Sequence, residues 1–232
     1  MKVLAVESSA TAASVALMEE EKILSEFFIH TGLTHSQTLM PMVEQVLKCA
    51  GRTMEDVDAF AVSVGPGSFT GVRIGVSSVK GLAFGTGKPC VGVSTLEAMA
   101  QNYREQEITV CAVMDARCQQ VYNAMFACKA DGAVERLCED RAISLQELQA
   151  ELKNYTGPVV LVGDGAALCW RTFGQEFPLL SLAPEHLRYQ HARGVARIAR
   201  EKIDRGEAVS DAQLVPVYLR LSQAERELKN KS

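Results

Sequence analysis

The order of predicted secondary-structure elements repeats about halfway along this chain of 232 residues. In each half a short apolar strand ends in an acidic turn, since Val3–Val6 leads into Glu7 and Val110–Val113 leads into Asp115. A hairpin, a helix, a strand and a second helix follow in both halves. This β-β-β-α-β-α order, present twice with little identity of residues, predicts an internal structural duplication.

Hydrophobic periodicity and capping residues give the bounds of these elements. The first half is expected to hold strands at 2–6, 14–18, 23–29, 59–64 and 90–93, helices at 36–50 and 72–84, a capping box at Thr34 and Gln37, and a third helix capped by Ser94. The second half is expected to hold strands at 110–113, 121–126, 133–137 and 159–162, a helix capped by Ser144 and a helix at 190–205. Hairpin-linked strands beside βα units predict an α/β fold with mixed sheets flanked by helices and a cleft between two lobes.

The length suits two lobes of about a hundred residues each. We place an N-terminal lobe at 1–103, a C-terminal lobe at 104–221 and a charged tail at 222–232. The composition, 47% hydrophobic and 22% charged, excludes disordered, collagen-like and coiled-coil classes. The net charge of -4 excludes a uniformly basic surface, so any contact with nucleic acid must be local or shared with a partner.

Cysteine usage and the N-terminus predict a cytoplasmic location. The seven cysteines are an odd number, and the first residues resemble a strand rather than a signal peptide. Cys49, Cys90 and Cys111 fall at expected core positions, which favours buried, inert thiols. No Cys or His pattern has metal-ligand spacing, so no metal site is expected. No apolar run is long enough to cross a bilayer, and a membrane is not an expected partner.

Two polar turns are candidates for a ligand site. The segment from Gly65 through Gly67 and Ser68 links a buried strand to a helix, so its amides could bind an anion; a tight turn explains the glycines equally well. Asp115 and Arg117 follow the first strand of the second half and are expected near the cleft, where they could hold a metal or a phosphate; a local ion pair is the alternative.

The helix expected at 190–205 carries a stripe of arginines. Arg193, Arg197 and Arg200 share one face, opposite an apolar stripe. A solvated face is the default interpretation of such a stripe, and phosphate contact is the alternative.

The helix expected at 72–84 is apolar or small nearly all round. One side, with Val76 and Val79, already completes a stripe for the core. The other side carries Ile74, Ser77, Ser78, Gly81 and Gly85. Glycine inside a helix destabilises it by about 0.5–1 kcal/mol relative to alanine, so this composition favours a close contact. We expect a partner subunit to pack here, with Met40 and Leu47 flanking the contact; cover by another element of the same chain is the alternative.

Longer motifs resemble those of the TsaB (YeaZ) family, the partner subunit in bacterial threonylcarbamoyladenosine synthesis on tRNA. These motifs are the start at 3–9, His35-Ser-x-x-Leu39-x-Pro41, Gly65-Pro-Gly-Ser-Phe-Thr-Gly-Val-Arg-Ile-Gly75, Gly92-Val-Ser-Thr-Leu96, Asp115-Ala-Arg117 with Val121-Tyr122, and Pro216-Val-Tyr-Leu-Arg220. The resemblance covers essentially the whole chain, and the run from Gly65 to Gly75 is highly specific.

The resemblance implies two ribonuclease-H-like lobes of the actin-like ATPase, sugar kinase and Hsp70 superfamily. It implies a TsaD-type transferase as partner, which transfers a threonylcarbamoyl group to the adenosine beside the tRNA anticodon. It also implies a homodimer when the chain is alone, a further ATPase subunit, and contact with tRNA only within the complex. ATP and a divalent metal are then expected on the partner subunits, and no cofactor on this chain alone. The candidate site for a nucleotide at the subunit interface is the pair of turns that contain Gly65, Gly67, Ser68, Asp115 and Arg117.

This sequence departs from an active relative at two places. TsaD-type chains carry metal-binding histidines where this chain has the segment 94–100, which contains none. The second half also lacks a glycine-rich acidic turn, having Asp115-Ala116-Arg117-Cys118 instead. We therefore expect a non-catalytic scaffold and dimerisation subunit. The competing hypotheses are a degenerate actin-like ATPase or metallopeptidase active on its own, and a stand-alone tRNA binder, which the acidic balance disfavours.

Overall fold

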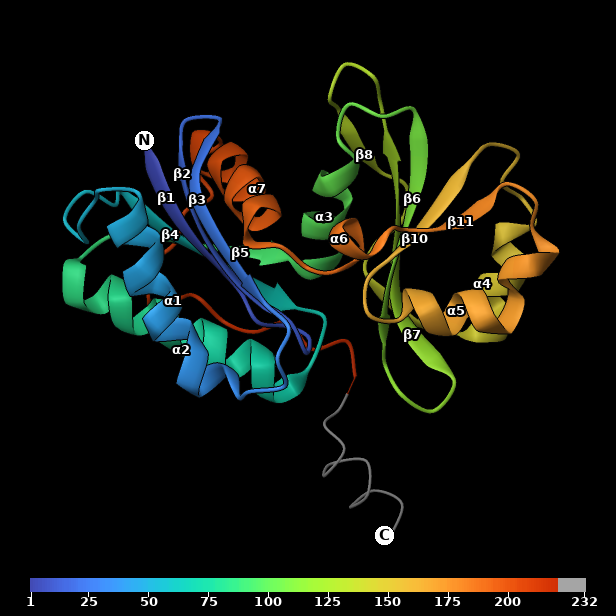
Figure 1. The fold of residues 1–232 in the computed structure, drawn as a ribbon, viewed down its shortest axis with the longest axis horizontal. Coiled ribbons are helices and arrows are strands. Elements are labelled where there is room, and N and C mark those ends of the chain that lie inside the picture. Colours follow the sequence, from blue (N-terminus) through green and yellow to red (C-terminus); the bar gives the residue numbers. More distant parts are fainter. Residues whose placement is uncertain (221–232) are drawn as a thin grey trace, which may run out of the picture.

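A computed structural model describes residues 1–220 of the chain, which form two lobes side by side (Figure 1). The first lobe is built on a sheet of β1 (Lys2–Glu7), β2 (Ala13–Glu19), β3 (Lys22–Ile29), β4 (Ala59–Gly65) and β5 (Cys90–Ser94). Its strand order is β3-β2-β1-β4-β5. The hairpin strands pair antiparallel, and β1, β4 and β5 run parallel. The sheet is therefore mixed, as the sequence predicts.

The second lobe repeats this arrangement. Its strands are β6 (Ile108–Asp115), β7 (Gln120–Cys128), β8 (Val134–Arg136), β9 (Arg141–Ser144), β10 (Val159–Val162) and β11 (Leu180–Leu182). Their order is β11-β10-β6-β7-β8, with β9 also paired to β7. Both β1 and β6 lie in the middle of their sheets, antiparallel to the next strand and parallel to the strand after the first helix of the repeat. The duplication is confirmed.

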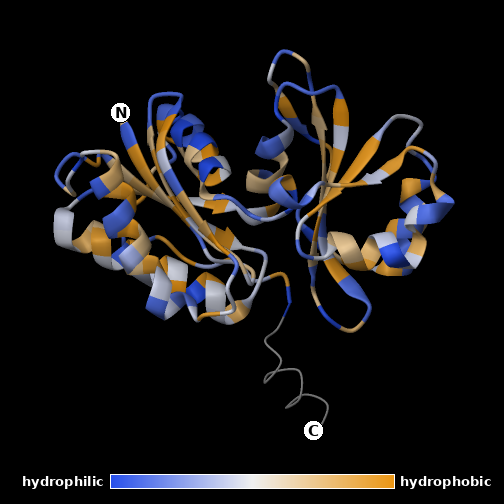
Figure 2. Cartoon of the chain, viewed as in Figure 1, coloured by the Kyte–Doolittle hydropathy of each residue, from blue (hydrophilic) through white to orange (hydrophobic). Residues whose placement is uncertain are grey.

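Helices cover both faces of each sheet (Figure 1). On the first sheet, α1 (His35–Cys49) and α2 (Phe69–Thr86) lie on one face and α7 (Ala192–Asp204) on the other. On the second sheet, α3 (Thr95–Ala100) lies on one face, and α4 (Leu145–Leu152) and α5 (Ala166–Phe173) lie on the other. Shorter helices are η1 (Gln101–Tyr103), η2 (Gly174–Glu176) and α6 (Glu185–Arg188). Figure 2 shows the strands between these layers as largely apolar.

Two helices pack against the sheet of the other half of the chain, across the predicted lobe boundary at residue 103. Helix α7 comes from the second half but packs Val195 and Ala199 against the first sheet, beside Val3 and Ala5. Helix α3 comes from the first half but packs Leu96 and Met99 against the second sheet. The predicted C-terminal lobe at 104–221 is therefore wrong for α7, because an apolar stripe does not specify which sheet it covers.

The segment after α7 also returns to the first lobe. Val209 exchanges two backbone hydrogen bonds of 2.8 Å with Cys90 at the edge of the first sheet. Leu214 is buried in the first core, and the amide of Val217 donates to the carbonyl of Val64 at 2.8 Å. We call residues 205–220 the C-terminal strap. The tail predicted at 222–232 lies outside the described residues.

Local predictions vary in outcome. The capping box at Ser144 is confirmed, whereas Thr34 makes no side-chain cap and α1 begins at His35. Helix α2 begins earlier than predicted, because Ser68 accepts a hydrogen bond from the amide of Gly71 and caps it. Cys49, expected in the core, is exposed. Among residues 1–220, no helix has the length and apolar character needed to cross a bilayer.

The largely buried carboxylate of Glu26 on β3 binds helix α7 to the first sheet. This carboxylate accepts hydrogen bonds from the amide of Arg193 at 3.1 Å, from its guanidinium at 2.9 Å and from the hydroxyl of Ser14 at 3.2 Å. The ring of His191 lies 3.4 Å away. Burial alone would raise the pKa of Glu26, but His191 and Arg193 outweigh it and hold that pKa below its ordinary value of 4.5.

We predict that Glu26→Gln lowers the free energy of unfolding by about 2–4 kcal/mol at pH 7, because it leaves Arg193 half-buried without its carboxylate. A lowered pKa in the folded state stabilises the protein above the unfolded pKa, and this stabilisation is lost as pH falls through the folded value. The difference from wild type should therefore shrink below about pH 4. Urea denaturation across this range measures it. Glu21→Gln, at an exposed position, is the control; a difference that does not vary with pH would contradict the prediction.

Candidate functional site

The two lobes enclose a cleft of about 560 Å³ at the carboxyl ends of their central strands. In sheets of this kind, ligands bind at the carboxyl edge. The cleft is lined by the turns that follow β1, β4, β6 and β10, by the start of α2 and by the end of the C-terminal strap. Of the predicted ligand residues, Gly67, Ser68, Asp115 and Arg117 line the cleft, whereas Gly65 does not.

The glycines of the 65–75 run allow close packing of backbone against backbone. A Cβ atom at Gly67 would lie 2.4 Å from the carbonyl oxygen of Ser9, and one at Gly71 would lie 2.2 Å from that of Ser8. One at Gly65 would lie 2.5 Å from the carbonyl oxygen of Val217. The amide of Ser68 donates to Ser9 at 2.6 Å and is therefore unavailable to an anion. This geometry favours the tight-turn interpretation.

Glu7, the acidic residue that ends β1, is turned into the core of the first lobe. It is completely buried and accepts hydrogen bonds from the hydroxyl of Ser63 and, at 2.6 Å, from the amide of Ser9. Burial raises the pKa of Glu7, although these hydrogen bonds act in the opposite direction. The carboxyl group therefore serves the packing of the turn and does not line the cleft.

Two carboxyl groups of the second lobe do line the cleft. Asp115 accepts hydrogen bonds from the amide and guanidinium of Arg117, at 2.7 and 3.2 Å, which is the local ion pair named as the alternative. Asp164 follows β10, and burial raises its pKa to about 6. Within residues 1–220 these carboxylates are not joined by a third His, Cys, Asp or Glu into a group that could hold a metal ion.

The C-terminal strap crosses the cleft from one lobe to the other. The ring of Tyr218 stacks on that of Phe69 with centroids 4.8 Å apart. The guanidinium of Arg73 lies 3.8 Å from the Phe69 centroid and donates to the Tyr218 hydroxyl at 2.8 Å. Arg220 then donates to the carbonyl of Ala116 in the second lobe. The strap thus joins the start of α2 to the turn after β6.

These residues do not fit the nucleotide and metal of an actin-like ATPase. The first-lobe turn has its amide and glycines committed to packing, and its carboxylate, Glu7, is enclosed by serines. The second-lobe turn has its carboxylate paired with Arg117. The sequence predicts an anion site at this cleft, but the packing of the two turns does not favour one.

The second candidate site is the outer face of α1 and α2, which lie side by side below the first sheet in Figure 1. Ser77, Gly81 and Gly85 are exposed, and nothing lies within 4 Å of a Cβ atom built at either glycine. Met40 is also exposed. Ile74 and Ser78 are half-buried, and Ile74 contacts the core from its rim.

Two features of this face differ from prediction. Leu47 is buried in the first core and cannot flank a contact, because the apolar arc of α1 is wide enough for position 47 to face the sheet. Phe84 was missed, although it is 80% exposed. It lies three residues after Gly81 and therefore on the same face, a spacing that could have identified it. We define the outer face as Met40, Ile74, Ser77, Ser78, Gly81, Phe84 and Gly85.

The three arginines of the predicted stripe on α7 have different ion-pair partners. Arg193 is bound to Glu26, and Arg200 to Glu20 and Asp204 at 2.7 and 3.1 Å. Arg197 makes no ion pair or side-chain hydrogen bond within residues 1–220. The stripe is thus neither wholly solvated nor equally free, at all three positions, to bind a phosphate.

Comparison with known proteins decides the family. The profile described as "TsaD: tRNA N6-adenosine threonylcarbamoyltransferase" matches residues 29–228. The Escherichia coli (strain K12) tRNA threonylcarbamoyladenosine biosynthesis protein TsaB is 33% identical over 233 residues, covering 100% of both chains. The chain belongs to the TsaB family. Its relatives thus confirm the resemblance of its motifs and connect the family with tRNA threonylcarbamoyladenosine biosynthesis.

Solved structures confirm the fold of this TsaB-family chain. YeaZ from Pseudomonas aeruginosa superimposes with a TM-score of 0.78 at 33% identity, over 94% of this chain and 99% of that one. The activator of the 2-hydroxyisocaproyl-CoA dehydratase from Clostridium difficile has a TM-score of 0.52 at 12% identity, over 89% and 97%. The latter likeness concerns the fold alone: two lobes, each a mixed sheet flanked by helices.

We predict opposite effects for one substitution at two positions of α2. Gly71→Ala should lower the free energy of unfolding by about 1–3 kcal/mol, because its Cβ atom would collide with a backbone carbonyl. Gly81→Ala should raise it by about 0.5–1 kcal/mol, since the site is open and alanine favours the helix. Thermal and urea denaturation of both variants measure this difference. Equal effects would show that the two positions are in similar surroundings.

Proposed function

We propose that this chain is a non-catalytic subunit that pairs with a TsaD-type transferase through the outer face of α1 and α2. The formation of threonylcarbamoyladenosine on tRNA, beside the anticodon, then takes place on the partner. The chain acts as a scaffold that holds the transferase in its working assembly. A further ATPase subunit and tRNA join only in that assembly.

The observation that carries this proposal is the exposure of apolar and small residues on the outer face. Phe84 leaves 80% of its surface in solvent, and Met40 leaves 39%. On the same face, Gly81 and Gly85 leave room for a second helix to approach the backbone of α2 closely. Exposed aromatic residues beside such a flat surface are typical of the centre of a protein interface.

The likeness between this chain and the transferase supports the choice of partner. The TsaD profile matches 29–228, so the transferase is expected to share this fold and to carry two equivalent helices. Two related surfaces can pair about a pseudo-twofold axis and form a four-helix contact. The same surface would pair with a second copy of this chain, which accounts for the expected homodimer in the absence of the partner.

The composition of the cleft and of α3 supports a non-catalytic role. The segment 94–100 contains no histidine, and its Ser94 caps α3 and donates to Asp140 at 2.5 Å. Thr, Leu, Glu, Ala and Met in the remaining positions offer no imidazole to a metal, and the carboxylate of Glu97 is paired with Arg136. The turns at the cleft, with Glu7 buried and Asp115 paired, supply no phosphate clamp. The competing hypotheses are a degenerate ATPase and a metallopeptidase active alone.

We predict that Phe84→Asp and Gly81→Trp each weaken the complex with the transferase at least about 30-fold, as expected at the centre of an interface. The melting temperature of the chain itself should not fall, because both positions are exposed and glycine is the poorer helix former at position 81. Size-exclusion chromatography with the partner and a tRNA modification assay measure the effect.

Matched controls lie on the second lobe. Leu179→Asp changes another exposed apolar residue, and Gly157→Trp another open glycine. Both should assemble normally. Stable Phe84→Asp and Gly81→Trp variants that still assemble and support modification would place the interface elsewhere. Unfolding of either variant would show that the face is covered by the chain itself.

We predict that the purified chain alone holds no stoichiometric metal and does not hydrolyse ATP above background. Elemental analysis and a phosphate-release assay measure this, with Asp115→Ala as the comparison. Turnover that disappears in Asp115→Ala would support the ATPase hypothesis, and stoichiometric metal would support the metallopeptidase. Either result would contradict the proposed function.

A further inference from the structure

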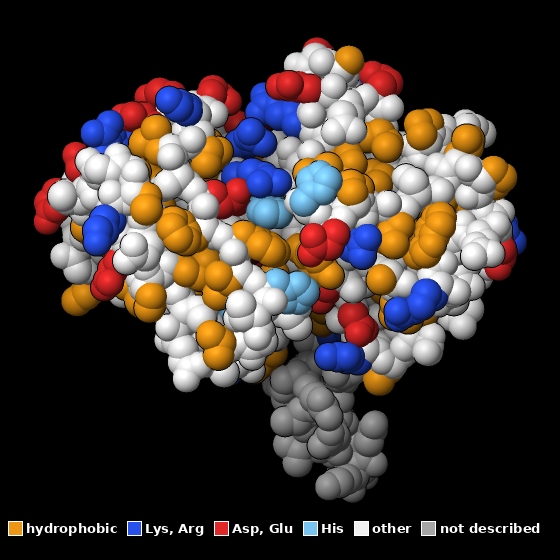
Figure 3. Space-filling model, in the orientation of Figure 1, with side chains coloured by type: hydrophobic (Ala, Val, Ile, Leu, Met, Phe, Trp, Pro, Cys, Tyr) orange, Lys and Arg blue, Asp and Glu red, His pale blue; other side chains and the backbone are white. Residues whose placement is uncertain are grey.

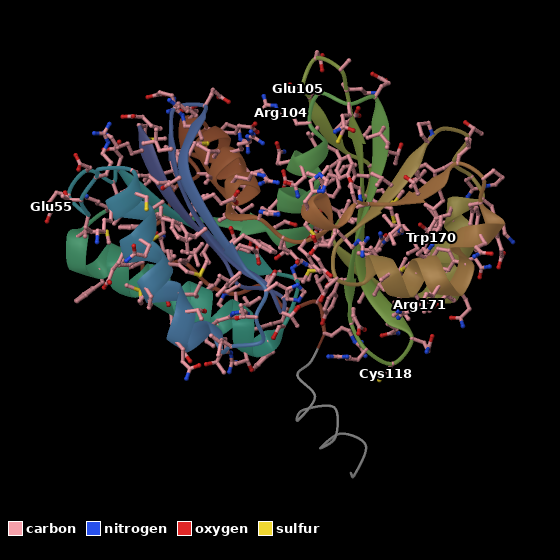
Figure 4. All side chains as sticks on the ribbon, in the orientation of Figure 1. Glu55, Arg104, Glu105, Cys118, Trp170 and Arg171 are labelled. Carbon is pink, nitrogen blue, oxygen red and sulfur yellow. The ribbon has the colours of Figure 1, made fainter. Side chains whose placement is uncertain are left out.

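Three arginines gather in the notch between the lobes, on the side where α7 faces the linker after η1. We call Arg104, Arg193 and Arg197 the arginine notch. Figure 3 shows Lys and Arg side chains together in this notch, and Figure 4 places Arg104 and Glu105 at its opening. The first of these arginines follows the crossover between lobes, and the other two project from α7, so both lobes contribute to the cluster.

The positive charge of the arginine notch is incompletely balanced. Arg193 is neutralised by Glu26 and also donates to Asn102 at 3.2 Å. Arg104 reaches only the highly exposed Glu21, at 4.0 Å, and its Nε atom is buried without a hydrogen-bond partner. Arg197 is half-buried and has no ion pair or side-chain hydrogen bond in the described chain. Burial, with Arg104 and Arg193 nearby, lowers the pKa of Arg197.

The surroundings of Arg197 differ from those of Arg200, which lies one turn further along the same helix. Arg200 lies between two carboxylates, Glu20 and Asp204, as expected of an arginine that stabilises the fold. Arg197 instead lies near Arg104 and Arg193, and the opposing effect of Glu21 and Glu105 does not restore its pKa to the ordinary value. A half-buried guanidinium beside two others destabilises the free protein unless an anion joins it.

A cluster of guanidinium groups is suited to binding a phosphate. Guanidinium groups bind phosphate oxygens through paired, charge-assisted hydrogen bonds, and two or more arginines commonly share one phosphate. Two pairs of stacked or edge-on rings follow Glu26 along the chain, one at the end of β3 and one just after it. Phe28 stacks on His191 at 4.6 Å, and the exposed His30 meets Tyr189 edge-on at 4.7 Å. Of these four rings only His30 is exposed, Phe28 and Tyr189 are half-buried, and His191 is buried. An exposed ring can stack on a nucleotide base, which single-stranded RNA presents.

We propose that the arginine notch binds a backbone phosphate of the tRNA in the assembled complex, with Arg104 and Arg197 as its ligands. The proposal rests on the proposed function, which brings tRNA to the complex. A net charge of -4 gives the chain no broad basic surface, so the contact is a single local one. The notch orients tRNA bound mainly elsewhere in the assembly.

The test compares Arg197→Met and Arg104→Met with Arg200→Met in the complex with the transferase. Methionine replaces the apolar stem of the arginine side chain with one of similar shape and removes the charged guanidinium. For the first two variants, the Kd for tRNA should rise about tenfold, and the slope of log Kd against log salt should fall by about 0.7–0.9 per lost contact. Arg200→Met should leave both quantities unchanged. Glu21→Gln, which removes an exposed rim carboxylate, should tighten binding about two- to threefold.

The melting temperature of the isolated chain separates a binding role from a structural one. Arg197→Met should leave it unchanged or raise it, since the substitution removes an unpaired, half-buried charge. A lower melting temperature with unchanged tRNA affinity and salt slope would show that Arg197 serves the fold, and would overturn the proposal. If Arg197→Met fails to fold, an unchanged tRNA affinity in Glu21→Gln overturns it equally.

Two further measurements distinguish tRNA phosphate from free phosphate, and failure of this proposal from failure of the proposed function. Inorganic phosphate is titrated into the isolated chain and should bind only in the millimolar range. Micromolar binding of phosphate, abolished by Arg197→Met while tRNA affinity stays unchanged, would assign the notch to a small ligand and contradict the proposal. A wild-type chain that does not support modification by its partner would instead contradict the proposed function.

Discussion

The fold depends on one close crossing of helices between the two sheets. At Gly194 of α7, a Cβ atom would lie 2.1 Å from the carbonyl oxygen of Ala98 on α3, so only glycine allows this approach. Each of the two helices also covers the sheet of the other half of the chain. The crossing therefore couples the lobes through their cores, and both the cleft and the arginine notch take their shape from that coupling. The carboxylate of Glu26 and the C-terminal strap reinforce it from either side.

Helix α2 shows how one residue type takes two roles according to its surroundings. At its start, Gly71 and Gly75 remove side chains so that the turn after β1 can pack against the helix. Near its end, Gly81 and Gly85 face open space, where they add nothing to the fold of the single chain. The first pair explains why the cleft is occupied by protein contacts. The second pair is not required by packing within the described chain, which is why we propose that a partner contacts this face.

The sequence predicts the strands, the duplication and the outer face because each depends on local patterns. Period-two and buried apolar runs specify β1 and β6, and the small residues of α2 indicate a surface the core does not need. Other features depend on distant parts of the chain. The assignment of α7 to the first sheet, the loss of Leu47 to the core and the enclosure of Glu7 by Ser63 are decided by packing between remote segments. The same holds for the arginines, since no local pattern distinguishes the paired Arg200 from Arg197.

The exchange of α3 and α7 has a consequence for how the chain is made. On the ribosome, the strands of the first sheet are complete once β5 has been synthesised, but the helix that covers one face of that sheet begins only at Ala192. At a translation rate of about 5–20 residues per second, the interval lasts on the order of 5–20 s. Throughout that time an apolar surface that includes Val3, Ala5 and Val91 stays uncovered on the nascent chain. The synthesis of residues 95–191 is therefore the stage at which this surface is most open to aggregation.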